Sequence, residues 1–165
     1  MKLSEKKYQS WMESLHEGVG LVDPYENIIY VNPAFSKILG YSKDEAIGMN
    51  LAKLVPEKEF QKILQGTVKR KQSISSVYDV TMIRKDGEPR NIKISAAPWI
   101  SDKGGFKGTI GMMLDITEQM QAEEKLRSNI KVLDNINIGI IGFDLMNKIV
   151  AFQNKYAIEI FEPDI

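Results

Sequence analysis

The feature that most constrains this chain is a period-two alternation of apolar and polar residues on both sides of Asp86-Gly87. Residues 78–82 alternate before this pair and residues 92–96 alternate after it. Side chains of a strand point to opposite faces in turn, and Asp-Gly favours a tight turn between two strands. The pattern predicts an antiparallel hairpin. A Gly-containing turn and a third strand over residues 109–115 follow it.

The N-terminal half adds a second hairpin and several helices. Two apolar runs, at residues 19–23 and 27–31, flank a turn that contains a Pro and an Asn, which predicts a hairpin. Short helices are expected at about residues 33–39, 43–47 and 50–53, and a longer one at about 57–70. The stripe expected to be buried on the longer helix is Phe60, Ile63, Leu64 and Val68. The order predicts an antiparallel α+β domain of about 100 residues.

Helical patterns flank this domain on both sides. Residues 4–17 predict an amphipathic helix that ends at Gly18, with one apolar face of Tyr8, Trp11, Met12 and Leu15. That face could pack on the neighbouring domain, form a dimer contact, or do both. At the other end, Asp115-Ile116-Thr117-Glu118 matches a capping box, and a charged helix is expected to run to about residue 133.

Composition excludes several classes of function. Lys+Arg and Asp+Glu are both 22, which argues against a protein that mainly grips nucleic-acid phosphates. There is no Cys and only one His, so a thiolate site or a multi-histidine metal site is excluded. No Ser-His-Asp set or phosphate-binding Gly-rich loop is present, so we expect no enzyme. The charged N-terminus and short apolar runs predict a cytoplasmic location without direct membrane contact.

The end of the chain repeats its beginning. Residues 133–154 resemble residues 15–32, with three pairs at an offset of 121 and one at 122 after one inserted residue, and a further pair at 122 follows these ranges. The matched pairs are Gly18 and Gly139, Asp23 and Asp144, Ile28 and Ile149, Asn32 and Asn154, and Ile38 and Ile160. The second copy stops after two expected strands and a helix.

Four motifs in order point to one family. They are Asn32-Pro33, Gly40-Tyr41-Ser42, Lys85-Asp86-Gly87 and Asp115-Ile116-Thr117. Their order and spacing over residues 12–134 resemble the PAS domains, or sensory boxes, of signal-transduction proteins. The resemblance implies a five-stranded antiparallel sheet of order 2-1-5-4-3 with flanking helices. It also implies a homodimer and a covalently linked output domain, which we expect to be a histidine kinase of a two-component system.

On this resemblance the chain divides into four parts. Residues 1–17 are the flanking helix, 18–116 the PAS domain, 117–134 the connector helix and 135–165 the beginning of a second, truncated PAS domain in tandem. The resemblance implies a signal relay from the sheet to the output domain through Asp115, Ile116, Thr117 and Glu118. It assigns no catalytic residue and no metal site.

The expected pocket lies between the longer helix and the inner face of the sheet, with an almost wholly apolar lining. The residues expected to line it are Phe35, Leu39, Phe60, Ile63, Leu64, Val80, Met82, Ile92, Ile94, Met112 and Leu114. A cysteinyl-flavin or coumarate adduct is excluded by the absence of Cys, and haem is disfavoured because residues 17–165 contain no His. Three alternatives remain: non-covalent flavin in a redox sensor, a small apolar ligand, and a filled core that serves only dimerisation and relay.

Overall fold

The computed structural model describes residues 7, 10–134 and 139–161. By its internal contacts the chain forms two compact units, Met1–Thr117 (unit 1) and Glu118–Ile165 (unit 2), which are described separately.

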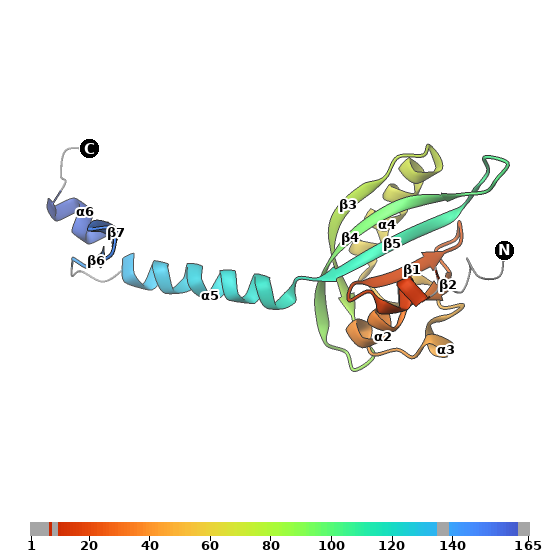
Figure 1. Ribbon diagram of the computed structural model, residues 1–165, viewed down its shortest axis with the longest axis horizontal. Coiled ribbons are helices and arrows are strands. Elements are labelled where there is room, and N and C mark those ends of the chain that lie inside the picture. The colour runs from red at the N-terminus through yellow and green to blue at the C-terminus, as the bar shows by residue number, and fades with distance from the viewer. Residues whose placement is uncertain (1–6, 8–9, 135–138, 162–165) are drawn as a thin grey trace. The chain divides into compact units, whose positions relative to one another are not determined.

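Unit 1 contains one five-stranded sheet in the order β2-β1-β5-β4-β3, with every neighbouring pair antiparallel (Figure 1). This confirms the predicted strand order and fold class. The register places Gly18 of the first strand opposite Met113 of the fifth, and Val80 of the third opposite Ile92 of the fourth. The strands are β1 (Gly18–Val22), β2 (Ile28–Val31), β3 (Ser76–Ile83), β4 (Pro89–Ile100) and β5 (Phe106–Asp115).

Four helical segments cover one face of this sheet (Figure 1). They are α2 (Pro33–Leu39), α3 (Lys43–Ala46), the 3-10 helix η1 (Leu51–Lys53) and α4 (Glu57–Lys71). Asn32 caps the first of these with its side-chain oxygen, and Gly40 ends it with φ 76°, where a side chain would be strained. Ser42 and Glu45 form a capping box at the start of α3. Local signals therefore set where these helices begin and end.

The core lies between these helices and the inner face of the sheet. Its apolar side chains come from both layers, with Val80, Met82, Ile92 and Ile94 on the strands and Ile63 on α4. Their burial provides the main driving force for folding this unit.

The segment before β1 differs from its prediction. Residues 10–14 are helical, but Gly18 is the first residue of β1 and does not end the helix. The reason is tertiary: Asn32 Nδ2 donates to the carbonyl oxygens of Met12 (3.1 Å) and Glu17 (3.0 Å), which holds this segment against the start of the sheet. Residues 1–6 and 8–9 lie outside the described residues, as does the expected dimer-face residue Tyr8.

Unit 2 contains a hairpin followed by a helix. Asn154 Oδ1 accepts hydrogen bonds from Ile140 N (2.9 Å) and Ala157 N (3.0 Å). Asn32 Oδ1 does the same in unit 1, from Val19 N (2.8 Å) and Phe35 N (3.0 Å). The elements of this region are α5 (Thr117–Asp134), which starts on the last residue of unit 1, then β6 (Ile141–Asp144), β7 (Ile149–Gln153) and α6 (Lys155–Phe161).

Asn32 and Asn154 therefore make equivalent bonds in their units, while the assignment of residues 135–165 to a second PAS domain stays a prediction. None of the helices within the described residues is long and apolar enough to span a membrane.

Candidate functional site

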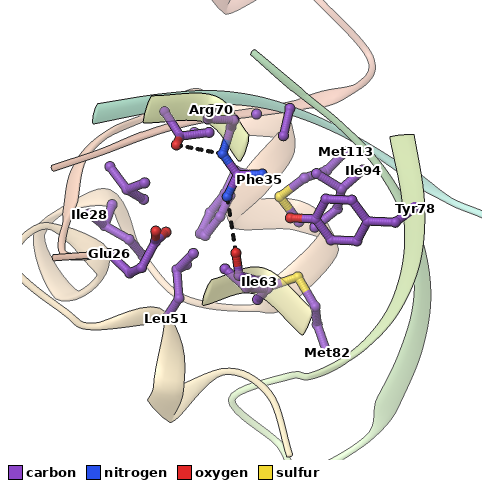
Figure 2. A pocket seen from close by; sticks show the side chains of 15 residues that line it. Glu26, Ile28, Phe35, Leu51, Ile63, Arg70, Tyr78, Met82, Ile94 and Met113 are labelled. Carbon is purple, nitrogen blue, oxygen red and sulfur yellow. Dashed lines mark hydrogen bonds between the residues drawn. The ribbon is translucent and has the colours of Figure 1, made fainter. Parts of the chain in front are cut away.

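A cavity of about 50 Å³ lies inside unit 1, between the inner face of the sheet and helices α2, η1 and α4. Figure 2 shows the side chains around it. Four of the predicted residues line it: Phe35, Ile63, Met82 and Ile94. Three others, Leu39, Val80 and Ile92, are buried in the surrounding core without lining it, and Phe60 packs partly buried against that core.

Two predicted lining residues on β5 face the wrong way. Met112 and Leu114 are 44% and 49% exposed, whereas Met113 between them is buried and lines the cavity. Apolar side chains occur at both the odd-numbered and the even-numbered positions of this strand. The alternation in the sequence therefore could not decide which set of side chains faces inward. The register of β5 against β4, with Met113 opposite Ile94, decides it.

The predicted face of α4 is also rotated. Leu64 and Val68 are exposed, and the buried side chains of this helix are Ile63, Thr67 and Arg70. Spacings of three and four residues place these three on one helical face. The sequence contained this signal, but a polar residue at such a position is ordinarily expected to face solvent.

These two α4 residues belong to a group that the sequence analysis missed, Glu26, Thr67, Arg70 and Thr109, called here the buried polar cluster. All four are at least 94% buried, and Glu26, Arg70 and Thr109 line the cavity. Thr67 Oγ1 donates to Glu26 Oε1 and accepts from Arg70 Nη2 (2.6 Å). Arg70 Nε donates to Thr109 Oγ1 at 2.9 Å. The surface that faces the cavity is thus almost wholly apolar, as expected, and the buried polar cluster at its wall is what the sequence did not predict.

The electrostatics of the cavity follow from burial. Burial raises the pKa of Glu26 above its ordinary value, although the bond from Thr67 and the charges of Arg70 and Lys71 act in the opposite direction. Burial likewise raises the pKa of Tyr78, against the nearby Arg70 charge. Glu26 also has φ 67°, which is unusual for a residue other than Gly. The turn between β1 and β2 therefore directs a carboxyl group into the core.

A second candidate region is the junction of β5 and α5. Asp115 Oδ1 accepts from Thr117 N (2.9 Å), and Thr117 Oγ1 accepts from Asn91 N (2.8 Å). Ile116 N donates to Asn91 O (2.9 Å), and both Ile116 and Thr117 are buried. Asp115 thus bonds the N–H of Thr117 and not that of Glu118, which the predicted capping box requires, and Glu118 is exposed. The start of α5 is thus held to β4 by two hydrogen bonds with the backbone of Asn91.

The remaining predicted site residues lie before β1. Trp11 is exposed, and Met12 and Leu15 are partly buried. Their role as a dimer face stays a prediction. Within residues 7, 10–134 and 139–161, His, Asp and Glu side chains form no group of three that could hold a metal ion.

The family model of the PAS domain matches residues 16–118. The chain belongs to the PAS domain family. A solved PAS domain of a Colwellia psychrerythraea protein superimposes with a TM-score of 0.64 at 22% identity, covering 70% of this chain and 98% of that one. An RNA-binding light-oxygen-voltage receptor gives 0.67 at 20% identity, covering 79% and 38%.

Relatives of this PAS chain are signalling and regulatory proteins. The bacterioopsin transcriptional activator of Halobacterium salinarum is 27% identical over 150 residues, which cover 83% of this chain and 21% of that protein. Sporulation kinase C of Bacillus subtilis is 29% identical, covering 76% and 29%. The chain thus spans less than a third of either relative. Residues 16–118 are a PAS sensory domain related to sensor kinases and regulators.

Proposed function

We propose that this chain is a cytoplasmic sensory and dimerisation module that detects a signal at its cavity and relays it to an output domain. The relay runs through Asp115, Ile116 and Thr117 into α5, and the output domain is a histidine kinase. The observation that carries this proposal is that the backbone of Asn91 accepts from Ile116 N and donates to Thr117 Oγ1, because these two bonds tie the start of α5 to the sheet.

The same two strands carry both the cavity and the junction. Ile94 of β4 lines the cavity and lies three residues from Asn91. Met113 of β5 also lines it and lies two residues from Asp115. A ligand or other signal that shifts these side chains would move strand positions directly bonded to α5. If α5 has two arrangements, such a contact shifts the equilibrium between them whenever the signal stabilises one arrangement more than the other.

Homodimer formation is part of the proposal. Trp11, Met12 and Leu15 precede β1, and the exposed Met112 and Leu114 give the outer face of the sheet an apolar surface. Contiguous exposed apolar residues commonly mark association surfaces. The second PAS domain in tandem is supported by the matching bonds of Asn32 and Asn154.

Two alternatives predict different observations. A flavin-binding redox sensor would be yellow when purified, but a flavin ring system needs far more room than about 50 Å³, so side chains would have to move. A ligand-free relay module would show only the mass of the unliganded chain in native mass spectrometry.

The relay is tested with Asp115→Ala in the full-length protein that contains this chain. We expect the variant to lose about 1 kcal/mol of unfolding free energy, because a single cap is removed, and to lose the difference in output activity between stimulated and unstimulated protein. Asp86→Ala is the matched control, since Asp86 Oδ1 accepts a similar bond from Glu88 N (3.0 Å) far along the chain from the junction. Unchanged stimulus-dependent output in Asp115→Ala would falsify the relay.

A further inference from the structure

The buried polar cluster contains a positive charge without a carboxylate partner. Arg70 is 1% exposed, and its guanidinium donates to neutral oxygens: Thr109 Oγ1 (2.9 Å), Thr67 Oγ1 (2.6 Å), Ile63 O (3.2 Å) and Ser76 Oγ (3.3 Å). Among the described residues, the ion pairs within 4.0 Å do not include Arg70. A buried charge is costly unless it is paired and hydrogen-bonded.

The cluster also contains a carboxyl oxygen without a donor. Glu26 is 1% exposed, and its Oε2 has no hydrogen-bond partner within the described part of the chain. Its other oxygen, Oε1, takes the Thr67 hydroxyl, which lies between Glu26 and Arg70. Figure 2 shows the Glu26 carboxyl and the Arg70 guanidinium at the same cavity. This cavity is therefore bordered by an acceptor that lacks a donor among the described residues and by a cation whose Nη1 donates to Ser76 Oγ at 3.3 Å. The Tyr78 side chain, which also lines the cavity, hydrogen-bonds Arg70 as well.

Size and lining limit what can meet both groups. About 50 Å³ is a third of the roughly 150 Å³ cavity that accommodates benzene, so a ligand of only a few heavy atoms fits. The rest of the wall is apolar, with Phe35, Met82 and Met113 among its side chains. An ammonium ligand would place a second cation beside Arg70. An alcohol would bring no negative charge to the guanidinium.

We propose that this cavity binds a monocarboxylic acid of one to three carbons, such as formate, acetate or propionate. The ligand's carboxyl O–H donates to Glu26 Oε2, its carbonyl oxygen accepts from Arg70 Nη1, and its alkyl part contacts the apolar wall. This inference rests on the proposed sensory function and names its ligand class. The bound state keeps one proton between two carboxyl groups, so their charges do not repel, and the remaining negative charge faces Arg70.

Binding is therefore coupled to one proton. At a pH where both Glu26 and the free ligand are ionised, formation of the complex takes up one proton from solvent for each ligand bound. The charged and titratable groups that act on Glu26 are Arg70 and Lys71 of α4, Asp23 of its own hairpin, and Tyr78 of β3, whose pKa rises partly through Glu26. Above the pKa of Glu26 the dissociation constant should rise by up to about tenfold per pH unit.

The test is isothermal titration of the purified chain with sodium formate, acetate and propionate between about pH 6 and pH 8.5, at ionic strength fixed with sodium chloride. We expect Kd values of about 0.1 to 10 mM, because so small a ligand makes few contacts. Titration in two buffers of different ionisation enthalpy should show uptake of one proton. Acetamide and benzoate, which lack the acid group or exceed the cavity, should not saturate the chain.

Three variants sharpen the test. Glu26→Gln supplies an amide donor without titrating, so acetate binding should persist and its pH dependence should disappear. Gly111→Ala places a methyl group at the cavity with no neighbour closer than 3.9 Å, so it should weaken propionate binding more than formate binding. Arg70→Gln should abolish binding in the folded protein. If it does not fold, the first two variants still decide the question.

Absence of saturable binding of all three acids would overturn the inference, as would binding with the same pH slope in Glu26→Gln. The first result would indicate that the cavity contains only water. Neither result would contradict the proposed relay through Asp115. The Asp115→Ala variant tests that relay by output activity, in response to a stimulus of any chemistry.

Discussion

At the scale of single residues, Glu26 is the position where the fold buries a side chain that is ordinarily ionised and exposed to solvent. A carboxyl group follows a turn into the core, where burial raises its pKa. The native state then binds more protons than the unfolded chain between the ordinary pKa of Glu and the raised value. The free energy of unfolding must fall as pH rises through that window. Glu26 is thus a cost at neutral pH, which a structural core residue would not impose.

We predict that Glu26→Gln removes this pH dependence. Relative to wild type, the variant should gain unfolding free energy as pH increases from about 4.5 to beyond the raised pKa, because its amide does not ionise. Urea denaturation of both proteins across this range measures the difference. A difference in unfolding free energy that is constant with pH would show that Glu26 titrates normally in the folded protein.

At the scale of elements, Gly108 and Gly111 of β5 have opposite requirements. A Cβ at Gly108 would lie 1.9 Å from Val22 O, and its φ of 152° is unfavourable for other residues. A Cβ at Gly111 would meet nothing closer than Ile94 Cγ2 at 3.9 Å. The close approach of β1 and β5 therefore requires glycine at position 108 but not at position 111.

We predict that Gly108→Ala lowers the unfolding free energy by at least about 3 kcal/mol, because backbone atoms must move to admit the methyl group. Gly111→Ala, the matched control, should change it by no more than about 1 kcal/mol in either direction. Thermal and urea unfolding of the two variants provide the comparison. Equal stabilities would mean that β1 and β5 separate freely near Gly108.

The elements themselves were predictable because their signals are local. Asn32-Pro33, Gly40, the Ser42 capping box and Asp86-Gly87 each act over a few residues. The helices and the turn that they delimit lie close to the expected residues. The candidate site was less predictable, since it depends on the phase of β5 and the rotation of α4. Arg70 becomes a core residue only through partners as distant in sequence as Thr109, which no local pattern reveals.

At the scale of the whole molecule, the two asparagines offer a comparison between units. Asn32 is buried and bonds four backbone groups, those of Met12, Glu17, Val19 and Phe35. Asn154 holds the corresponding place in unit 2, where large apolar side chains of the hairpin such as Phe143 and Ile149 are exposed. A two-stranded sheet with an uncovered apolar face is marginal in water. Unit 1 should therefore carry most of the measurable stability of this chain.

We predict that Asn32→Ala lowers the unfolding free energy of unit 1 by about 2 to 4 kcal/mol, because it removes a cap and leaves buried backbone groups without partners. Asn154→Ala should leave that transition within about 0.5 kcal/mol of wild type. Hydrogen exchange read residue by residue separates the two, since amides of β3 to β5 report unit 1 and those of β6 and β7 report unit 2. If Asn154→Ala destabilised β3 to β5 as much as Asn32→Ala does, the two units would fold as one cooperative domain. Unit 2 would then be an integral part of the sensor and not the start of a separate one.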